Sequence, residues 1–449
     1  MRTRQRARRR WAIALTGLAV IGAAIYGAAA FAGDGAVNTI RVMPGPTSAT
    51  EAAAVAAAEA QVGADYVASD NVEFVKSFKL AADGVGARVV GHYLYVTTTK
   101  DLEIYDISTP TDPQLQGLVT IDIEFENEQV PTNGSVLGIS GQTPSTTAGG
   151  FCPSTYPVNS SSGCLILFDV RDKANPVQVA TVANAGDHTN TCVLDCTYMY
   201  GSTGSITDLR GVLGPAHTAT KLSVNWIQYL KSKGYPFYSS CHHNTELRPG
   251  VILTACDPIY LLSVNKKDGG SITAPKVLAS ADFLAAPDDK KRFVHGVEFP
   301  RQGADRIMLA GGETNFQPTC DETRGAFATF VTKDGGTHFT FSDQIRPKAG
   351  NYLDGNPPDG TFHLGCSVHW FEPHKSFRNG GLVAMASYEN GTRFLKVGKD
   401  GSITEVGFFE PLGGATSAPH WAPDGRTVYA VDYQRGLDVI RWNGDLYVP

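Results

Sequence analysis

The segment Val294-His295-Gly296-Val297-Glu298-Phe299-Pro300 decides the fold, because variants of it recur along the chain. Its copies are His243–Leu247, Ser367–Glu372 and Pro419–Asp424, with a looser one at His188–Cys192. The segments that begin at Val294, Ser367 and Pro419 each precede an apolar run that is typical of a buried strand. They recur at roughly 50 to 75 residues, about the length of one four-stranded unit with its loops. This spacing predicts a radial or stacked array that gathers the repeated His side chains.

The composition favours many short strands. A chain of 449 residues exceeds one ordinary core, which leaves either about two to three domains or one repeat architecture. The 48 Gly and 25 Pro favour frequent turns, and 18% charged residues is low for a long helical protein.

The first 33 residues are typical of a targeting segment. Six Arg lie among the first ten residues, and Trp11 to Phe31 is uncharged and apolar. This stretch is long enough to cross a bilayer, so residues 1–33 are a signal peptide or a signal anchor. Ala30-Phe31-Ala32 is an A-x-A site before Gly33 and favours cleavage. Either reading places the rest of the chain outside the cytoplasm, secreted or anchored to the membrane by this segment alone.

Residues 34–70 form an Ala-rich linker, and residues 71–449 remain for the folded body. The net charge of the whole chain is -6. Without the six Arg of the leader, the remainder carries about -12, which argues against nucleic acid as a partner.

Eight Cys in an exported chain predict disulfides. Sequence alone does not determine their connectivity, but neighbouring Cys are the simplest to join. The expected pairs are Cys152 with Cys164, Cys192 with Cys196, Cys241 with Cys256, and Cys320 with Cys366.

Two stretches share a strand that ends in Asp followed by Ile or Val. They are Ile104–Pro110 and Leu167–Val170, and Gly436–Ile440 is a terminal echo without the Pro turn. The pattern resembles the LVIVD-repeat β-propellers of exported bacterial proteins, in which each repeat is one blade. The resemblance covers the ends of the chain better than residues 188–348. It implies a propeller and export but little about activity, because propellers host unrelated functions.

The unit starts predict an all-β, seven-bladed β-propeller for residues 71–449. Phe74 to Leu80 would supply the outer strand of the seventh blade and close the ring. Leu222 to Lys233 has apolar residues at helical spacing and Gly234 after it, which predicts a short helical insertion in the third unit. The units start near Gly84, Phe125, His188, His242, Val294, Cys366 and Pro419.

The repeated His residues predict a metal site. The innermost strand of each blade lines the centre of a propeller, so equivalent positions at its start form a ring. Glu128 occupies this position in the second unit, and neutral imidazole is a common ligand of Cu, Fe and Zn. The five His predicted to bind the metal are His188, His243, His295, His369 and His420. His242, beside His243, is an alternative member of the ring.

Three of these His are followed by a Glu three residues later: Glu246, Glu298 and Glu372. Metal-bound His usually donates its other N–H to a carboxylate or carbonyl, so these Glu, with Glu128, are predicted to orient the ligands. Positions i and i+3 of a flat strand face opposite sides, so an interaction within one unit requires a bulge or turn. The alternative is that the repeated His are structural and bind no metal.

Two classes of function remain. The sequence has no G-x-S-x-G, no P-loop, no H-E-x-x-H and no G-x-G-x-x-G between a strand and a helix. The favoured class is an exported binding or scaffold propeller with a transition metal at its centre, which contacts a protein or small-molecule partner at one face. The other is a Cu- or Fe-dependent oxidase or oxygenase that uses the same His ring.

Overall fold

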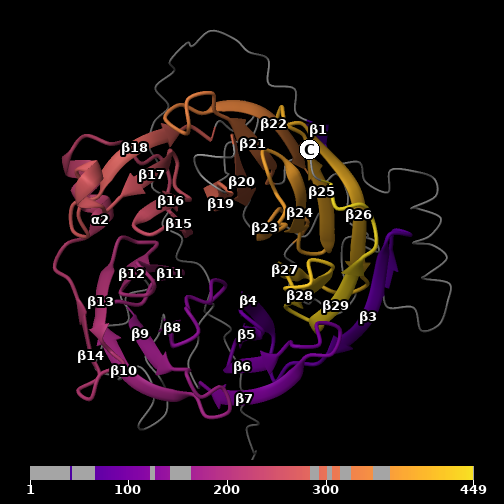
Figure 1. The fold of residues 1–449 in the computed structure, drawn as a ribbon, viewed down its shortest axis with the longest axis horizontal. Coiled ribbons are helices and arrows are strands. Elements are labelled where there is room, and N and C mark those ends of the chain that lie inside the picture. Colours follow the sequence, from indigo (N-terminus) through magenta and orange to yellow (C-terminus); the bar gives the residue numbers. More distant parts are fainter. Residues whose placement is uncertain are drawn as a thin grey trace, which may run out of the picture. The chain divides into compact units, whose positions relative to one another are not determined.

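Seven small, mainly antiparallel sheets are arranged around a common hub (Figure 1). The computed structural model describes residues 41–42, 66–121, 127–141, 163–283, 293–300, 306–313, 325–346 and 365–447. The prediction of a seven-bladed β-propeller is confirmed. The predicted leader, residues 1–33, lies outside the described residues, and no helix within them is long and apolar enough to cross a membrane.

The blades follow one another around the ring in chain order, and within each blade the strands run from the hub outward. Blades 1 to 3 contain β4 (Gly84–Val90), β5 (Tyr93–Thr98), β6 (Asp101–Asp106) and β7 (Gln114–Thr120); β8 (Val136–Gly141), β9 (Cys164–Asp169) and β10 (Val177–Ala183); and β11 (Asn190–Val193), β12 (Tyr198–Gly201), β13 (Ile206–Gly211) and β14 (Thr218–Lys221).

Blades 4 to 7 complete the ring. They contain β15 (Asn244–Arg248), β16 (Val251–Thr254), β17 (Ile259–Ser263) and β18 (Lys276–Ala281); β19 (Phe293–Glu298), β20 (Ile307–Glu313), β21 (Phe327–Val331) and β22 (Thr340–Arg346); β23 (Phe371–Pro373), β24 (Gly381–Ala386), β25 (Thr392–Val397) and β26 (Ile403–Pro411); and β27 (Thr416–Trp421), β28 (Thr427–Asp432), β29 (Gly436–Trp442) and β3 (Val72–Phe78).

The ring closes through an early strand. β3 pairs with β29, so the segment predicted to close the seventh blade does so. Two short strands from the region predicted as a linker also extend blades: β2 (Tyr66–Ala68) pairs with β26, and β1 (Arg41–Val42) pairs with β22. Joining an early and a late part of the chain in one sheet closes the ring of blades.

In blade 2 the hub position is taken by residues 127–132. Gln129 forms an isolated bridge with Ala87 of β4, and Thr132 forms one with Leu137 of β8. Gly86 makes this close approach possible, because a Cβ on Gly86 would lie 2.0 Å from the carbonyl oxygen of Glu128. The segment that carries Glu128 therefore packs directly against the hub strand of blade 1.

The core is divided among the interfaces between blades. The middle strands are buried on both faces because neighbouring blades stack on them, so they are continuous apolar runs such as the Val-Ile-Leu-Thr of β16. The clusters at the seven interfaces of the described residues include Leu94 with Tyr429, Ile104 with Ile139, Leu165 with Met199, Tyr200 with Tyr260, Leu253 with Met308, Leu309 with Val383, and Phe394 with Trp442.

The predicted helical insertion is α2 (Trp226–Ser232), between β14 and β15. Its N-cap residue Asn225 accepts a hydrogen bond from the backbone N–H of Gln228, as expected at a helix start. Trp226 and Leu230 pack into the interface of blades 3 and 4. A further 3-10 turn, η1 (Lys266–Asp268), lies between β17 and β18.

Two of the expected disulfides, Cys192–Cys196 and Cys241–Cys256, are present. Cys164 and Cys366 are also disulfide-bonded. Their expected partners, Cys152 and Cys320, lie outside the described residues.

Candidate metal centre

A β-bulge directs His242 toward the hub. The backbone N–H of His242 donates to the carbonyl of Ala255, while the N–H of Ala255 donates to the carbonyl of His243. Two residues of the inner strand therefore face one residue of its neighbour, which changes the direction of the extra side chain. This geometry gives adjacent His residues different environments.

Two other blades repeat this arrangement. His369 and Trp370 both face Ala386. The backbone N–H of His369 donates to the carbonyl of Ala386, and the backbone carbonyl of Trp370 accepts from the N–H of Ala386. In β19 the register shifts at His295, which is the extra residue. The repeated sequence signal is thus a His at a bulge that opens each inner strand.

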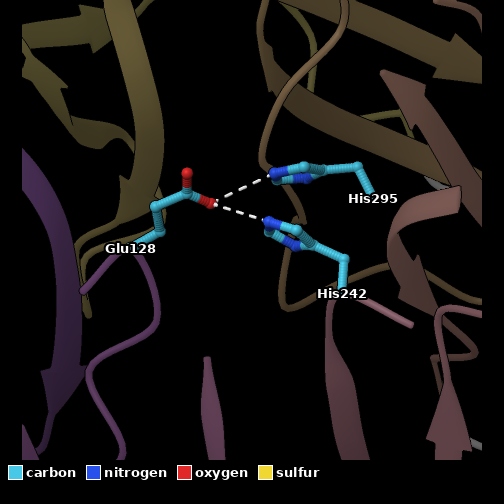
Figure 2. A group of neighbouring side chains, drawn as sticks. All are labelled: Glu128, His242 and His295. Carbon is cyan, nitrogen blue, oxygen red and sulfur yellow. Dashed lines mark hydrogen bonds and ion pairs between the residues drawn. The ribbon is translucent and has the colours of Figure 1, made fainter. Parts of the chain in front are cut away.

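Four imidazoles converge on one carboxylate. The Nε2 atoms of His295 and His242 lie 3.1 and 3.5 Å from Oε2 of Glu128, approaching the same oxygen (Figure 2). The Nε2 atoms of His369 and His188 lie 3.3 and 3.5 Å from Oε1. Neighbouring rings follow one another in an arc, with centroid separations of 4.6 Å for His188–His242, 3.8 Å for His242–His295 and 4.3 Å for His295–His369.

The cluster is removed from solvent except at one member. The side chains of His295 and His369 are fully buried, and those of Glu128 and His242 nearly so, whereas His188 is 30% exposed. Such a concentration of imidazole at a buried carboxylate provides nitrogen and oxygen ligands suited to a transition metal. Glu128, His242 and His295 form one candidate ligand group, and His295, His369 and Glu313 form an adjoining one.

Hydrogen bonds determine the tautomer of His369. Its Nδ1 lies 2.7 Å from the carbonyl oxygen of Ser417, which can only accept, so Nδ1 carries the proton. In a neutral ring the lone pair then belongs to Nε2, which faces Glu128. An N–H bound to a carbonyl behind the ring is the usual arrangement of a metal-ligating His. Trp370 holds the carboxylate from another side, since its Nε1–H donates to Glu128 over 2.9 Å.

The electrostatics favour an ionised Glu128 beside neutral rings of His242 and His295. Burial opposes ionisation of Glu128, but His369, His242 and His188 outweigh burial and hold its pKa well below the ordinary value. Burial, reinforced by His369, lowers the pKa of His295 to about 4, and burial with His295 lowers the pKa of His242 well below its usual range. Burial also opposes the charge on His369, but Glu128 raises its pKa overall. His242 and His295 are therefore uncharged at neutral pH, which is the state that metal binding requires.

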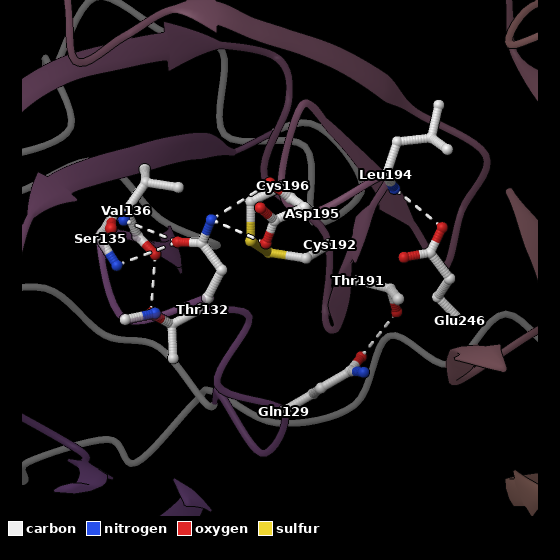
Figure 3. Close-up of a disulfide and its surroundings, with 12 residues drawn as sticks. Gln129, Thr132, Ser135, Val136, Thr191, Cys192, Leu194, Asp195, Cys196 and Glu246 are labelled. Atoms are coloured by element: carbon white, nitrogen blue, oxygen red, sulfur yellow. Dashed lines mark hydrogen bonds between the residues drawn. A yellow bond between two sulfur atoms is a disulfide. The ribbon is translucent and has the colours of Figure 1, made fainter. Parts of the chain in front are cut away.

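Backbone and side-chain contacts fix the segment that carries Glu128. The adjacent Gln129 accepts a hydrogen bond from the Thr191 hydroxyl over 3.1 Å and donates to the carbonyl of Asn244 over 3.0 Å. Figure 3 shows the Gln129–Thr191 contact beside the disulfide of Cys192 and Cys196. Blades 2, 3 and 4 are thus joined next to the candidate ligands.

The structure does not bring all of the predicted ligands together. His243 lies next to His242 but faces the hydroxyl of Thr245, 3.0 Å from its Nε2. His420 pairs with Glu372 through a 3.0 Å contact between Nδ1 and Oε2. The members found at Glu128 are His188, His295 and His369, joined by His242.

The predicted Glu residues have several different roles. Glu128 lies at the centre of the cluster, not behind it. Glu372 orients His420, and Glu298 accepts from Thr245 over 3.3 Å. Glu246 accepts from the backbone N–H of Leu194 over 2.8 Å (Figure 3) and from that of Gly250 over 2.7 Å, so it supports the backbone. Within the part of the chain that the structure describes, none of these three Glu pairs with the His that lies three residues before it.

Sequence reasoning missed Trp370, Glu313 and Tyr388. Trp370 follows His369 directly, so its place next to a repeated His was the sequence signal that could have identified it. Glu313 and Tyr388 lie at the end of β20 and after β24, and no repeat marked them. Glu313 accepts a hydrogen bond from the hydroxyl of Tyr388.

A match to a known repeat family agrees with this architecture. Residues 85–121 match the LVIVD repeat, and they span β4 to β7. The chain is a seven-bladed β-propeller that contains an LVIVD repeat. The matched repeat corresponds to one complete blade. A solved structure titled "Structure of U3-55K" is similar over 83% of this chain and 98% of that chain, with 8% sequence identity and a TM-score of 0.49. No curated protein matches the chain.

Proposed function

We propose that this LVIVD-repeat propeller is an extracytoplasmic binding scaffold that holds one transition-metal ion at its hub. The ligands would come from His188, His242, His295, His369 and Glu128. The observation that carries this proposal is the convergence of four Nε2 atoms on one buried carboxylate, at 3.1 to 3.5 Å. Five residues from five different blades meet there, which a purely local packing role for each His would not require.

A structural His in the same protein provides the contrast. His374 has both ring nitrogens bound to protein groups: Nδ1 lies 2.7 Å from the hydroxyl of Ser376, and Nε2 lies 3.0 Å from the carbonyl of Gly425. At the hub, by contrast, the Nε2 atoms of four rings face the two oxygens of Glu128, one of which also accepts the indole N–H of Trp370. A cation in their midst would accept all of these lone pairs at once, and this favours a metal over a structural network.

The donor set indicates Cu, Fe or Zn. Imidazole suits these ions, whereas Mg²⁺ and Ca²⁺ are bound mainly by oxygen ligands. A single ionised carboxylate would neutralise part of the charge of a divalent ion in a buried site. The disulfides Cys192–Cys196 and Cys241–Cys256 support an oxidising, extracytoplasmic location. Membrane attachment would occur only through the basic and apolar segment of residues 1–33.

A Cu- or Fe-dependent oxidase or oxygenase is the second candidate. The observation that favours it is the packing of oxidisable aromatic rings against the ligands: Trp370 lies 5.2 Å from the ring centroid of His295, and Tyr388 lies 4.4 Å from that of His369. A visible or paramagnetic signal that changes on addition of a thiol or an apolar substrate would support the enzyme. Bound zinc would favour the scaffold.

Elemental analysis of protein purified without chelator tests the metal proposal. We expect about one Cu, Fe or Zn ion per chain, lost on His295→Ala or His369→Ala. His243→Ala and His420→Ala are the matched controls, because these His belong to the same repeat but lie away from Glu128, and both should keep the metal. A wild-type protein without metal would overturn this proposal, and a loss of stability in its His369→Ala variant would assign the His residues a structural role instead.

A further inference from the structure

Tyr388 combines several unusual features next to the candidate metal centre. Its ring is almost completely buried and stacks on His369, with centroids 4.4 Å apart and planes inclined by 29°. Its backbone adopts a φ of +43°, a strained conformation for a bulky residue that persists only where the surroundings enforce it. The surroundings do so, since its carbonyl accepts from the N–H groups of Gly391 and Thr416, each over 2.9 Å. Strain of this kind concentrates at functional sites.

The hydroxyl of Tyr388 has a built-in proton acceptor. It donates to the carboxylate of Glu313, which is itself buried. Glu313 extends from the end of β20 in blade 5, whereas Tyr388 lies between β24 and β25 in blade 6, so the contact joins two blades. A phenol that is hydrogen-bonded to a carboxylate can lose an electron and a proton together, because the proton already has a short path to its acceptor.

A second tyrosine leads away from the hub. The ring of Tyr433 lies 6.3 Å from that of Tyr388 and 6.4 Å from that of His369, and Tyr433 is partly exposed. Electron transfer weakens steeply with distance, so rings at these separations form an efficient path. Tyr433 lies about equally far from Tyr388 and His369, so the three rings connect the buried cluster to a partly exposed side chain.

We propose that Tyr388 is a redox-active residue that relays an electron between a metal ion bound at His369 and Tyr433, with Glu313 holding the proton. This inference rests on the proposed metal site. In the oxidising direction, Tyr388 gives one electron to the oxidised metal or to an external one-electron oxidant, and its O–H bond breaks. The proton moves to the Glu313 carboxylate, which becomes a carboxylic acid. Reduction of the tyrosyl radical reverses both transfers.

The test uses the full propeller loaded with zinc, which is neither redox-active nor paramagnetic. The protein is mixed with hexachloroiridate(IV), which is reduced to iridium(III) by one electron, and is frozen rapidly for electron paramagnetic resonance. We expect an organic radical whose hyperfine structure changes when the tyrosines are ring-deuterated. Tyr388→Phe should lose this signal while it keeps the stacked ring and the zinc.

Tyr429→Phe is the matched control. Tyr429 is a buried tyrosine of β28 whose hydroxyl donates to the carbonyl of Pro110 over 2.9 Å, away from the cluster. Its variant loses a buried tyrosine hydroxyl as Tyr388→Phe does, and it should retain the radical. Tyr433→Phe should slow radical formation, because it removes the partly exposed step.

Loading with Cu²⁺ locates the radical. A radical on Tyr388 would lie beside the ligand His369, so magnetic coupling to Cu²⁺ should broaden its signal beyond detection, whereas radicals on distant tyrosines would remain sharp. An unchanged radical in zinc-loaded Tyr388→Phe, or no broadening by Cu²⁺, would overturn the relay while the metal site stands. Elemental analysis of the same samples separates the two proposals, because protein that binds neither zinc nor copper overturns both.

Discussion

Replacing Glu298 with Gln should stabilise the propeller at neutral and alkaline pH but not at acidic pH. Glu298 is the Glu of the repeated hub segment, and it accepts from Thr245 over 3.3 Å. Burial raises its pKa from 4.5 to about 7, with a further rise from Glu372 and an opposing effect from Arg88. Because the folded state holds the proton more tightly than the unfolded state, the contribution of Glu298 to stability is complete below pH 4.5 and is lost as pH rises through 7.

The size of the effect follows from the two pKa values. At about 1.4 kcal/mol per pH unit, a rise from 4.5 to about 7 corresponds to a loss of about 3 kcal/mol in the free energy of unfolding. Glu298 keeps some contact with solvent, so this is an upper figure. Gln has nearly the same shape and stays neutral, so the variant should escape this loss.

Urea unfolding followed by tryptophan fluorescence measures the difference, with chelator present so that no metal adds its own pH dependence. The stability of Glu298→Gln minus that of the wild type should rise by up to about 3 kcal/mol between pH 4.5 and about pH 8. Glu73→Gln is the control, because Glu73 is an exposed carboxylate of the outer strand β3 and its replacement should give no such trend. A difference for Glu298→Gln that stays flat across this range would refute the assignment of a buried, protonated Glu298.

Three further predictions follow from local geometry. Gly86→Ala should lower metal affinity on the order of tenfold or more, because its Cβ would lie 2.0 Å from the backbone of Glu128. Metal titration measures this affinity, and a value equal to that of the wild type would show that the segment adapts without moving the ligand. Replacing both Cys of Cys241–Cys256 with Ser should cost about 3 kcal/mol in unfolding free energy and replacing Cys192–Cys196 about 2, because the first closes the longer loop; the reverse order would contradict this reasoning. Asn225→Ala should cost about 1 kcal/mol through loss of the α2 cap, and an unchanged thermal midpoint would show that packing of Trp226 alone holds the helix.

Most of the fold was predictable from sequence because it depends on local pattern. The apolar runs of the middle strands, the turns between them and the recurrence of the His-containing segment follow from residue order alone. The closing strand was also predictable, since Phe74 to Leu80 alternates and precedes the first complete unit. The pairing of β1 and β2 with blades 5 and 6 was not, because these segments are two and three residues long and their partners lie hundreds of residues away.

For the candidate site, the sequence by itself determined that His188, His295 and His369 would occupy equivalent places at the hub. Only the tertiary structure decided between His242 and His243, because the β-bulge opposite Ala255 sends one imidazole to Glu128 and the other to Thr245. It also placed Tyr388 on His369, from a strained turn that no repeat marks. The physical reason is that residue spacing specifies which strand position recurs, whereas the direction of a side chain depends on hydrogen bonds to a neighbouring strand and on packing between blades.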